Sequence, residues 1–133
     1  MSKHATISED SIRDLVHQFY AQVREDDLIG PIFQARIKDW DTHLAKMVDF
    51  WSGVMLKTTR YEGRPFPAHA QISEIRKTHF ARWLDLFQTT AHSVFEETPA
   101  HEFIKRSHMI ADNFQHLLFT VLGREDTEAA PQD

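Results

Sequence analysis

An apolar stripe of helical period runs through residues 39–58 and constrains the fold of this chain more than any other feature. The stripe consists of Trp40, His43, Leu44, Met47, Phe50, Trp51, Val54 and Met55. Spacings of three and four residues place all of these side chains on one face of an α-helix. Such a face must be buried against other elements, and no strand-like alternation longer than a few residues offers a sheet for this purpose. The sequence therefore predicts an all-α fold.

The helical period recurs in three other segments. A first helix follows the capping residues and acids of 6–11, and the Gly-Pro pair of 30–31 ends its region. Another helix begins with the Ser-Glu pair of 73–74. The last begins with the Thr-Pro pair of 98–99 as N-cap and first-turn proline, and it ends near Gly123. We expect these helices to share one core.

The length limits the number of domains, and the charge limits the classes of binding partner. The 133 residues suit one domain, for which we expect residues 1–123, with 124–133 as a polar, disordered tail. The formal charge is −5, and no block of lysine or arginine occurs, which argues against nucleic acid and anionic membranes as partners. No apolar run reaches the length of a membrane span, and the N-terminus lacks the core of a signal peptide. We expect a cytoplasmic monomer.

The stretch R-P-F-P-A-H-A-Q-I-S, residues 64–73, breaks the helical pattern. Pro65 and Pro67 would each remove a hydrogen bond from a helix interior, and each disfavours helical backbone at the preceding residue. We therefore expect a stiff, non-helical lead-in that delivers His69 to the start of the next helix. Taken alone, His69 is most simply a loop histidine.

The chain has nine histidines and no cysteine, which narrows the possible metal sites. Without cysteine there are no disulfides, iron–sulfur clusters, Cys-based zinc sites or covalent c-type haem. The helical zinc-protease motif fails because Lys105 stands where the second histidine belongs, and no Glu-x-x-His pair of a di-iron bundle occurs. His43 and His69 remain. Taken alone, His43 is most simply a core histidine with one buried acceptor, because histidine is intermediate in burial.

A haem site accounts for both histidines together. Haem iron without a cysteine ligand is held by a proximal histidine, and the 10 Phe, 3 Trp and 4 Met can line an apolar slot. The opposite face then needs polar groups amid apolar walls, which Tyr20 and Trp83 supply from the apolar sides of their helices. A haem-free helical interaction module is the alternative, and the presence or absence of a Soret band separates the two.

Several short stretches, in order, resemble the group III truncated haemoglobins of bacteria. They are F-Y-A-Q-V-R (19–24), G-P-I-F (30–33), W-D-T-H-L-A-K (40–46), F-W-S-G (50–53), Y-E-G-R-P (61–65), R-W-L-D-L-F (82–87) and M-I-A-D-N-F-Q (109–115). The resemblance covers roughly residues 8–122. It implies a truncated globin, a two-over-two helical sandwich around one haem b.

The resemblance also implies a role for individual residues. His69 falls at the proximal, iron-ligating position, and the three distal polar positions are those of Tyr20, His43 and Trp83. The further haem contacts would be Phe33, Met47, Phe50, Tyr61 and Arg76. The segment after His69 departs from the pattern, which leaves open where the next helix starts and whether Tyr61 or Arg76 contacts a propionate. His43 either ligates iron or gates the pocket.

The implied ligands are O2, NO, CO or other small molecules at iron. Donors such as Tyr20 and Trp83 would slow the release of O2, because a hydrogen bond to a charged group contributes about 1.5–3 kcal/mol. Slow release favours redox chemistry, such as nitric oxide dioxygenation or reaction with peroxide, for which an electron-donating reductase would be the partner. O2 binding, storage or transport without turnover is the alternative, and a gas sensor is a further one.

Overall fold

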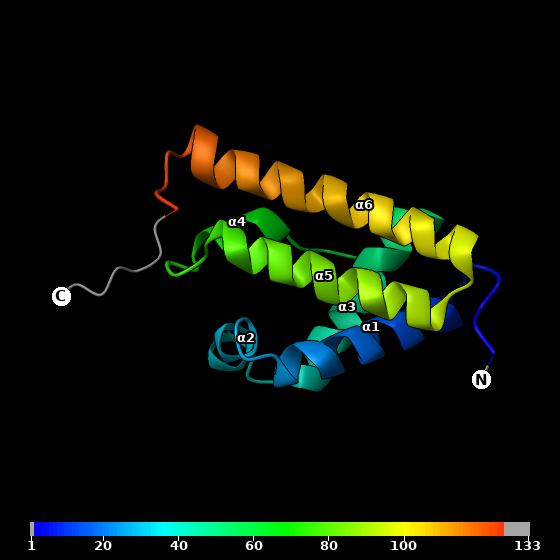
Figure 1. The fold of residues 1–133 in the computed structure, drawn as a ribbon. Coiled ribbons are helices and arrows are strands. Elements are labelled where there is room, and N and C mark those ends of the chain that lie inside the picture. The colour runs from blue at the N-terminus through cyan, green and yellow to red at the C-terminus, as the bar shows by residue number, and fades with distance from the viewer. Residues whose placement is uncertain (1, 127–133) are drawn as a thin grey trace.

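The computed structural model describes residues 2–126, and these fold as helices, as the periodicity predicts (Figure 1). The helices are α1 (Glu9–Glu25), α2 (Gly30–Arg36), α3 (Trp40–Leu56), α4 (Pro65–Ala70), α5 (Lys77–Val94), α6 (Glu97–Gln115) and the π-helix η1 (His116–Val121). The only strand-like pairing among the described residues is an isolated bridge between His4 and Phe95. The all-α prediction is confirmed. Within the described part of the chain, no helix combines the length and the apolarity needed to cross a membrane.

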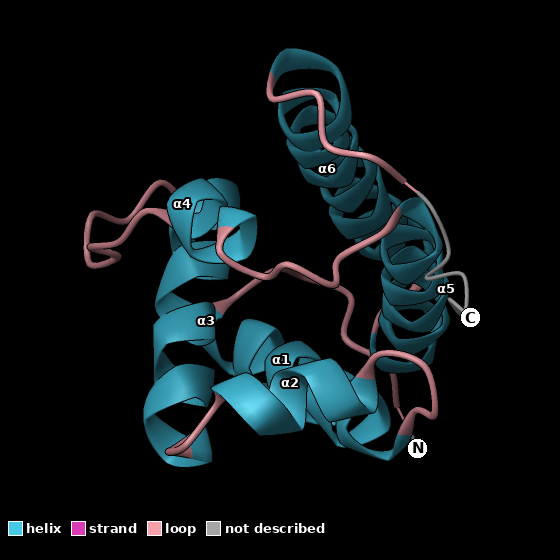
Figure 2. Ribbon diagram, turned by 90° about the vertical axis from the view of Figure 1, so that its left-hand side faces the viewer, coloured by secondary structure: helices cyan, strands magenta, loops and turns pink. Residues whose placement is uncertain are grey.

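Two layers of paired helices make up the fold. The antiparallel helices α5 and α6 form one layer, and α1 crosses α3 in the other (Figures 1 and 2). The layers meet where Phe19 of α1 packs edge-on against Phe87 and Trp83 of α5, at ring-centroid distances of 5.2 and 5.4 Å. The short helices α2 and α4 flank this frame. The layers thus leave their open side between α3, α4 and the start of α5.

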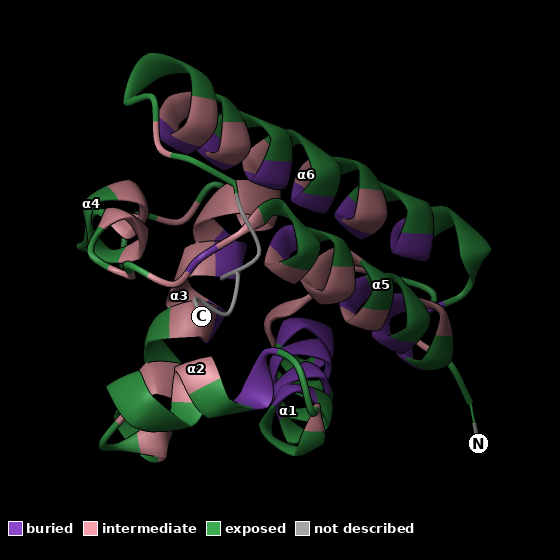
Figure 3. Cartoon of the chain, turned by 60° about the vertical axis from the view of Figure 1, so that its left-hand side comes forward, coloured by how far each residue is buried: buried purple, intermediate pink, exposed green. Residues whose placement is uncertain are grey.

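Burial is uneven across the frame. Helix α1 is almost entirely buried along one face, whereas α4 has no buried residue (Figure 3). The main core joins α1, α3, α5 and the start of α6. A second, smaller cluster groups Ile75, Phe80, Ala111, Phe114 and Leu118 near the end of α6. The molecule is therefore well packed at one end and thinly packed around α4.

The proline segment is helical, contrary to the prediction. Pro65 is the first residue of α4 and Pro67 the third. The first N–H groups of an α-helix have no partner within the helix, so a proline there loses no hydrogen bond. His69 consequently lies inside α4, one turn after Pro65. The pair Gly30–Pro31 likewise begins α2 rather than ending the preceding region.

Two other helix starts also differ from the prediction. Helix α5 begins at Lys77 instead of 73–74, because residues after His69 form tight turns, with the Ile75 N–H donating to the Ile72 carbonyl at 3.3 Å. Helix α6 begins at Glu97, so Pro99 is its third residue instead of its first. Both segments contain several residues that could cap a helix, so the local sequence does not specify at which residue the helix begins. Of the expected tail, residues 127–133 lie outside the described part.

Candidate functional site

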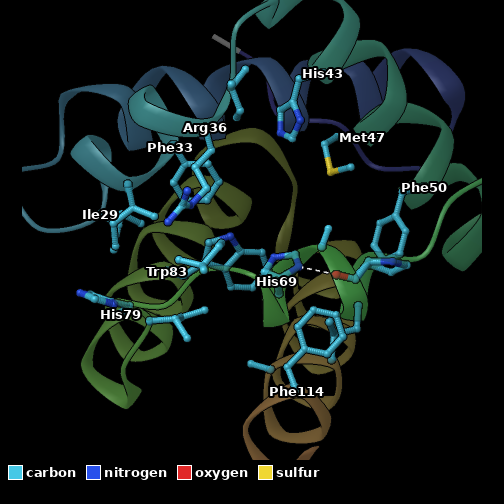
Figure 4. Close-up of a pocket in the computed structure, with 18 of the residues that line it drawn as sticks. Ile29, Phe33, Arg36, His43, Met47, Phe50, His69, His79, Trp83 and Phe114 are labelled. Atoms are coloured by element: carbon cyan, nitrogen blue, oxygen red, sulfur yellow. Dashed lines mark hydrogen bonds between the residues drawn. The ribbon is translucent and has the colours of Figure 1, made fainter. Parts of the chain in front are cut away.

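A cavity of about 350 Å³ occupies the open side of the helical frame, between α3, α4 and α5 (Figure 4). This volume is within the range of about 300–1,000 Å³ that is typical of sites for small molecules and cofactors. The walls are mainly aliphatic and aromatic, and the polar side chains that line the cavity include Tyr20, Arg36, His43, Lys46, Tyr61, Arg64, His69, His79 and Trp83. The cavity is therefore an apolar slot with a few polar groups.

His69 reaches the cavity from α4 with one ring nitrogen already engaged. Its Nδ1 lies 2.6 Å from the carbonyl oxygen of Pro65, one turn earlier, and Nδ1–H donates there because a carbonyl can only accept (Figure 4). Nε2 is then the unprotonated nitrogen. Burial lowers the pKa of the imidazole, and the bond to Pro65 offsets only part of that shift. A neutral imidazole with Nδ1–H bonded to a carbonyl is the form in which histidine binds metals.

His43 faces the same cavity from α3, opposite His69 (Figure 4). Its Nε2 is buried and has no hydrogen-bond partner among the described residues. Burial is the main reason that the pKa of His43 is lowered, followed by the charges of Lys46 and His69. An unpaired buried polar group costs roughly 1–3 kcal/mol. The site is thus short of one polar partner, which a ligand in the cavity could supply.

Tyr20 and Trp83 add two donors from two further helices. Tyr20 of α1 is 6% exposed, and its ring stands edge-on to that of His43 at 5.1 Å. Burial alone raises the pKa of its hydroxyl, so the hydroxyl stays protonated at neutral pH and can donate. Trp83 of α5 is stacked on Phe87, with ring centroids 5.2 Å apart and an interplanar angle of 6°. Stacking fixes the indole plane. Donors from α1, α3 and α5 therefore line one cavity.

Of the other residues predicted to contact a haem, all but one line the cavity. The cavity is lined by Phe33, Met47, Phe50 and Tyr61, together with Tyr20, His43, His69 and Trp83. Arg76 does not line it; its backbone N–H instead donates to Nδ1 of His79 at 3.0 Å. The tertiary structure thus brings together eight of the nine predicted side chains, from five helices and one loop.

The cavity is also lined by three arginine and lysine residues that the sequence did not predict for the site: Arg36, Lys46 and Arg64. Lys46 stands three residues after His43 on α3, so helical spacing could have placed it beside the site. Arg36 and Arg64 come from the end of α2 and the N-cap of α4, where no periodicity reports on side-chain direction. Together these cations make the cavity suitable for a group that carries carboxylates.

The comparisons with known proteins agree with this geometry. Residues 6–118 match the family model described as bacterial-like globin. The chain belongs to the bacterial-like globin family. It is 35% identical over 125 residues to a group 3 truncated hemoglobin of Campylobacter jejuni, an alignment that covers 91% of this globin and 98% of the relative. The predicted family resemblance is confirmed.

A solved structure supports the same assignment for the fold. The crystal structure of group III truncated hemoglobin from Campylobacter jejuni is similar to this globin with a TM-score of 0.86 and 35% sequence identity. The match covers 90% of this chain and 98% of that one. The predicted truncated-globin architecture is therefore confirmed.

Membership of a globin family implies haem-based ligand binding, and the cavity fits a haem. The slot offers a neutral histidine nitrogen on one side and the unpaired Nε2 of His43 on the other. Its apolar walls match a macrocycle, and its basic residues match propionates. A histidine nitrogen beside an apolar slot is the arrangement by which globins hold haem.

Proposed function

We propose that this globin holds haem b through His69 and binds O2, NO, CO or other small ligands on the opposite face, for redox chemistry. The observation that carries the proposal is the bond from His69 Nδ1 to the Pro65 carbonyl, which leaves a neutral Nε2 free for a metal. When bound, haem would supply a redox-active iron with one face open to ligands. An electron-donating reductase would complete a catalytic cycle.

The other residues would orient the cofactor and its ligand. Lys46, Arg64 and Arg36 would bind the carboxylates of haem, and Arg36 is itself held by Glu74 at 2.6 Å. Tyr20 and Trp83 would donate hydrogen bonds to a small ligand, because both side chains line the cavity and each carries a donor. His43 either bonds the same ligand, ligates the metal or gates the cavity.

The number of donors favours reaction over delivery. Each hydrogen bond to a ligand that carries negative charge contributes about 1.5–3 kcal/mol, so even one would slow ligand release by about tenfold or more. A carrier needs ready release, whereas a catalyst benefits from retention. Nitric oxide dioxygenation and reaction with peroxide are the redox functions that this site would support. O2 storage or transport without turnover is the alternative.

Rapid mixing tests this function. The ferrous protein, equilibrated with O2, is mixed with nitric oxide while the haem spectrum and the nitrate yield are followed. Stoichiometric nitrate and ferric haem support dioxygenation. Displacement of O2 without nitrate, combined with no reaction toward peroxide, would favour storage or transport.

A further inference from the structure

The chain after α6 returns to the loop that follows His69. The π-helix η1 ends at Val121, and Gly123 turns the chain with a φ of +68°, a left-handed conformation that glycine adopts without strain. The N–H of Arg124 then donates to the Leu118 carbonyl at 3.0 Å, which fixes the direction of the segment. In Figure 1 this orange-red segment descends beside the green loop between α4 and α5. We call residues Arg124–Asp126 the C-terminal strap.

Arg124 binds the carbonyl end of α4. Its Nη1 donates to the carbonyl of Ala70 at 3.1 Å, and its Nη2 donates to those of Ile72 and Ser73 at 2.8 and 3.1 Å. Ala70 is the last residue of α4, whereas Ile72 and Ser73 belong to the loop that follows. The last carbonyls of a helix lack partners within the helix and carry partial negative charge, so a guanidinium that bonds the Ala70 carbonyl also offsets the helix dipole. Ala70 directly follows His69. The cap therefore acts on the turn that holds the imidazole.

Asp126 binds the other end of the same loop. Its carboxylate accepts a hydrogen bond from the N–H of Lys77, the first residue of α5, at 2.8 Å. An acidic group at a helix N-terminus is favourable for the same electrostatic reason. On its other side, the loop is held by Arg36 of α2, which binds Glu74. The strap thus joins the end of α4 to the start of α5 from a distant part of the chain.

Helix α4 needs this outside support because it is weak by itself. It has only six residues, starts without a side-chain cap and has no buried residue. Helices this short are not stable in water without tertiary contacts. Its ring contacts are those of Phe66 and His69 with Phe114, at 5.7 and 4.9 Å. Close to His69, the Ile72 N–H donates to the His69 carbonyl at 3.0 Å, and the hydrogen bonds of Arg124 hold the same turn from a distant part of the chain.

We propose that Arg124 is a positioning residue for His69: by capping α4 it fixes the imidazole toward the cavity, and thereby slows loss of the cofactor. The proposal rests on the proposed role of His69 as the iron ligand. Without the cap, the last turn of α4 would fray and the imidazole would tilt. The effect would be felt on the proximal side alone, because Tyr20, His43 and Trp83 lie on other helices.

The test compares wild type with Arg124→Ala, Arg124→Lys and, as a matched control, Arg13→Ala, which removes an exposed arginine of α1 that forms an ion pair with Asp10. Three quantities are measured on the haem-loaded protein: transfer of haem to an excess of apomyoglobin, the iron–histidine stretching band of the ferrous form, and hydrogen exchange in peptides covering 70–77. A cap is worth about a threefold to thirtyfold change in an equilibrium. We expect haem loss to accelerate by about this factor in Arg124→Ala.

We further expect Arg124→Ala to shift or broaden the iron–histidine band and to speed exchange in 70–77. Arg124→Lys keeps the positive charge but lacks the two guanidinium nitrogens that donate to different carbonyls, so its three readouts should lie between those of wild type and Arg124→Ala. Arg13→Ala should change none of them. If haem loss and the band stay at wild-type values, the positioning role is overturned, even if exchange accelerates. A wild-type protein without an iron–histidine band would instead contradict the role of His69. Should Arg124→Ala not fold, Arg124→Lys and Asp126→Asn decide the matter by the same three readouts.

Discussion

The two sides of the cavity are built in different ways. On the distal side, Tyr20, His43 and Trp83 project from α1, α3 and α5, long helices whose apolar faces make up the main core. On the proximal side, His69 projects from a six-residue helix without a buried residue. Its imidazole is fixed by one short hydrogen bond to Pro65. The packing of long, buried helices holds the donors, whereas the proposed metal ligand is held by hydrogen bonds and the ring of Phe114.

This difference indicates how each side should fail. Packed helices keep their positions when one polar atom is removed, so a distal substitution should change ligand kinetics while the cofactor stays bound. A short helix held by a few polar contacts shifts when one of them is lost, so a proximal substitution should weaken retention of the cofactor. The three predictions below test this contrast, from the largest expected effect to the smallest.

Replacing His69 with alanine should have the largest effect. The substitution removes the nitrogen that we propose as the iron ligand, so haem should be lost readily and the five-coordinate ferrous spectrum should disappear. Added imidazole should partly restore the spectrum, because it fits the space that the side chain leaves. Absorption and resonance Raman spectra measure both effects.

His101→Ala is the matched control for this change, since His101 is an exposed histidine of α6 whose side chain is 59% accessible. It should retain haem as the wild type does. A His69→Ala protein with unchanged haem affinity and an unchanged ferrous spectrum would show that another residue holds the iron.

Replacing Tyr20 or Trp83 with phenylalanine should have an intermediate effect, confined to ligands. Removing one charge-assisted hydrogen bond should speed O2 dissociation by about tenfold to a hundredfold. The double variant should fall short of the product of the single effects, because the two donors share one acceptor. Stopped-flow measurement of O2 and CO dissociation tests this.

Carbon monoxide is the internal control here, because it carries little negative charge when bound and its dissociation should change much less. Equal acceleration for both gases would mean that the pocket has merely loosened. In that case the distal side would be no more robust than the proximal one, and slow O2 release would no longer count against an O2 carrier.

Replacing His43 with leucine should have the smallest effect, visible mainly in the pH dependence. Burial lowers the pKa of His43 below 6.5, the ordinary value for histidine. The imidazole is therefore neutral at pH 7 and takes up a proton only when the pH falls below 6.5. If His43 gates the cavity, wild-type ligand association should change as the pH is lowered from 8 to 5. The leucine variant should show no such change. Flash photolysis of the CO complex measures the rates, and matching profiles in both proteins would exclude the gate.

Local sequence determined that the four long helices form, though not where each begins, and it predicted most of the pocket side chains. The stripe of 39–58 fixed the face of α3 on which His43, Met47 and Phe50 stand, because helical period alone sets which side chains share a face. Aromatic residues on apolar faces pointed to a slot, and the family resemblance added Tyr61 and the roles of His69, Tyr20 and Trp83. The helical faces, unlike the roles that the resemblance implies, follow from neighbours within one turn of the chain.

The tertiary structure decided what depends on distant residues. Pro65 starts α4 instead of blocking a helix, and that helix persists because Arg124 and Phe114, roughly fifty residues farther along, complete it. The cations around the cavity are Arg36, Lys46 and Arg64, whereas the predicted Arg76 lies elsewhere. Arg36, Arg64 and Arg76 stand at helix ends, where no period exists from which side-chain direction can be inferred. Periodicity encodes which face a helix buries, but a short helix and the rim of a cavity exist only through contacts that the folded chain makes.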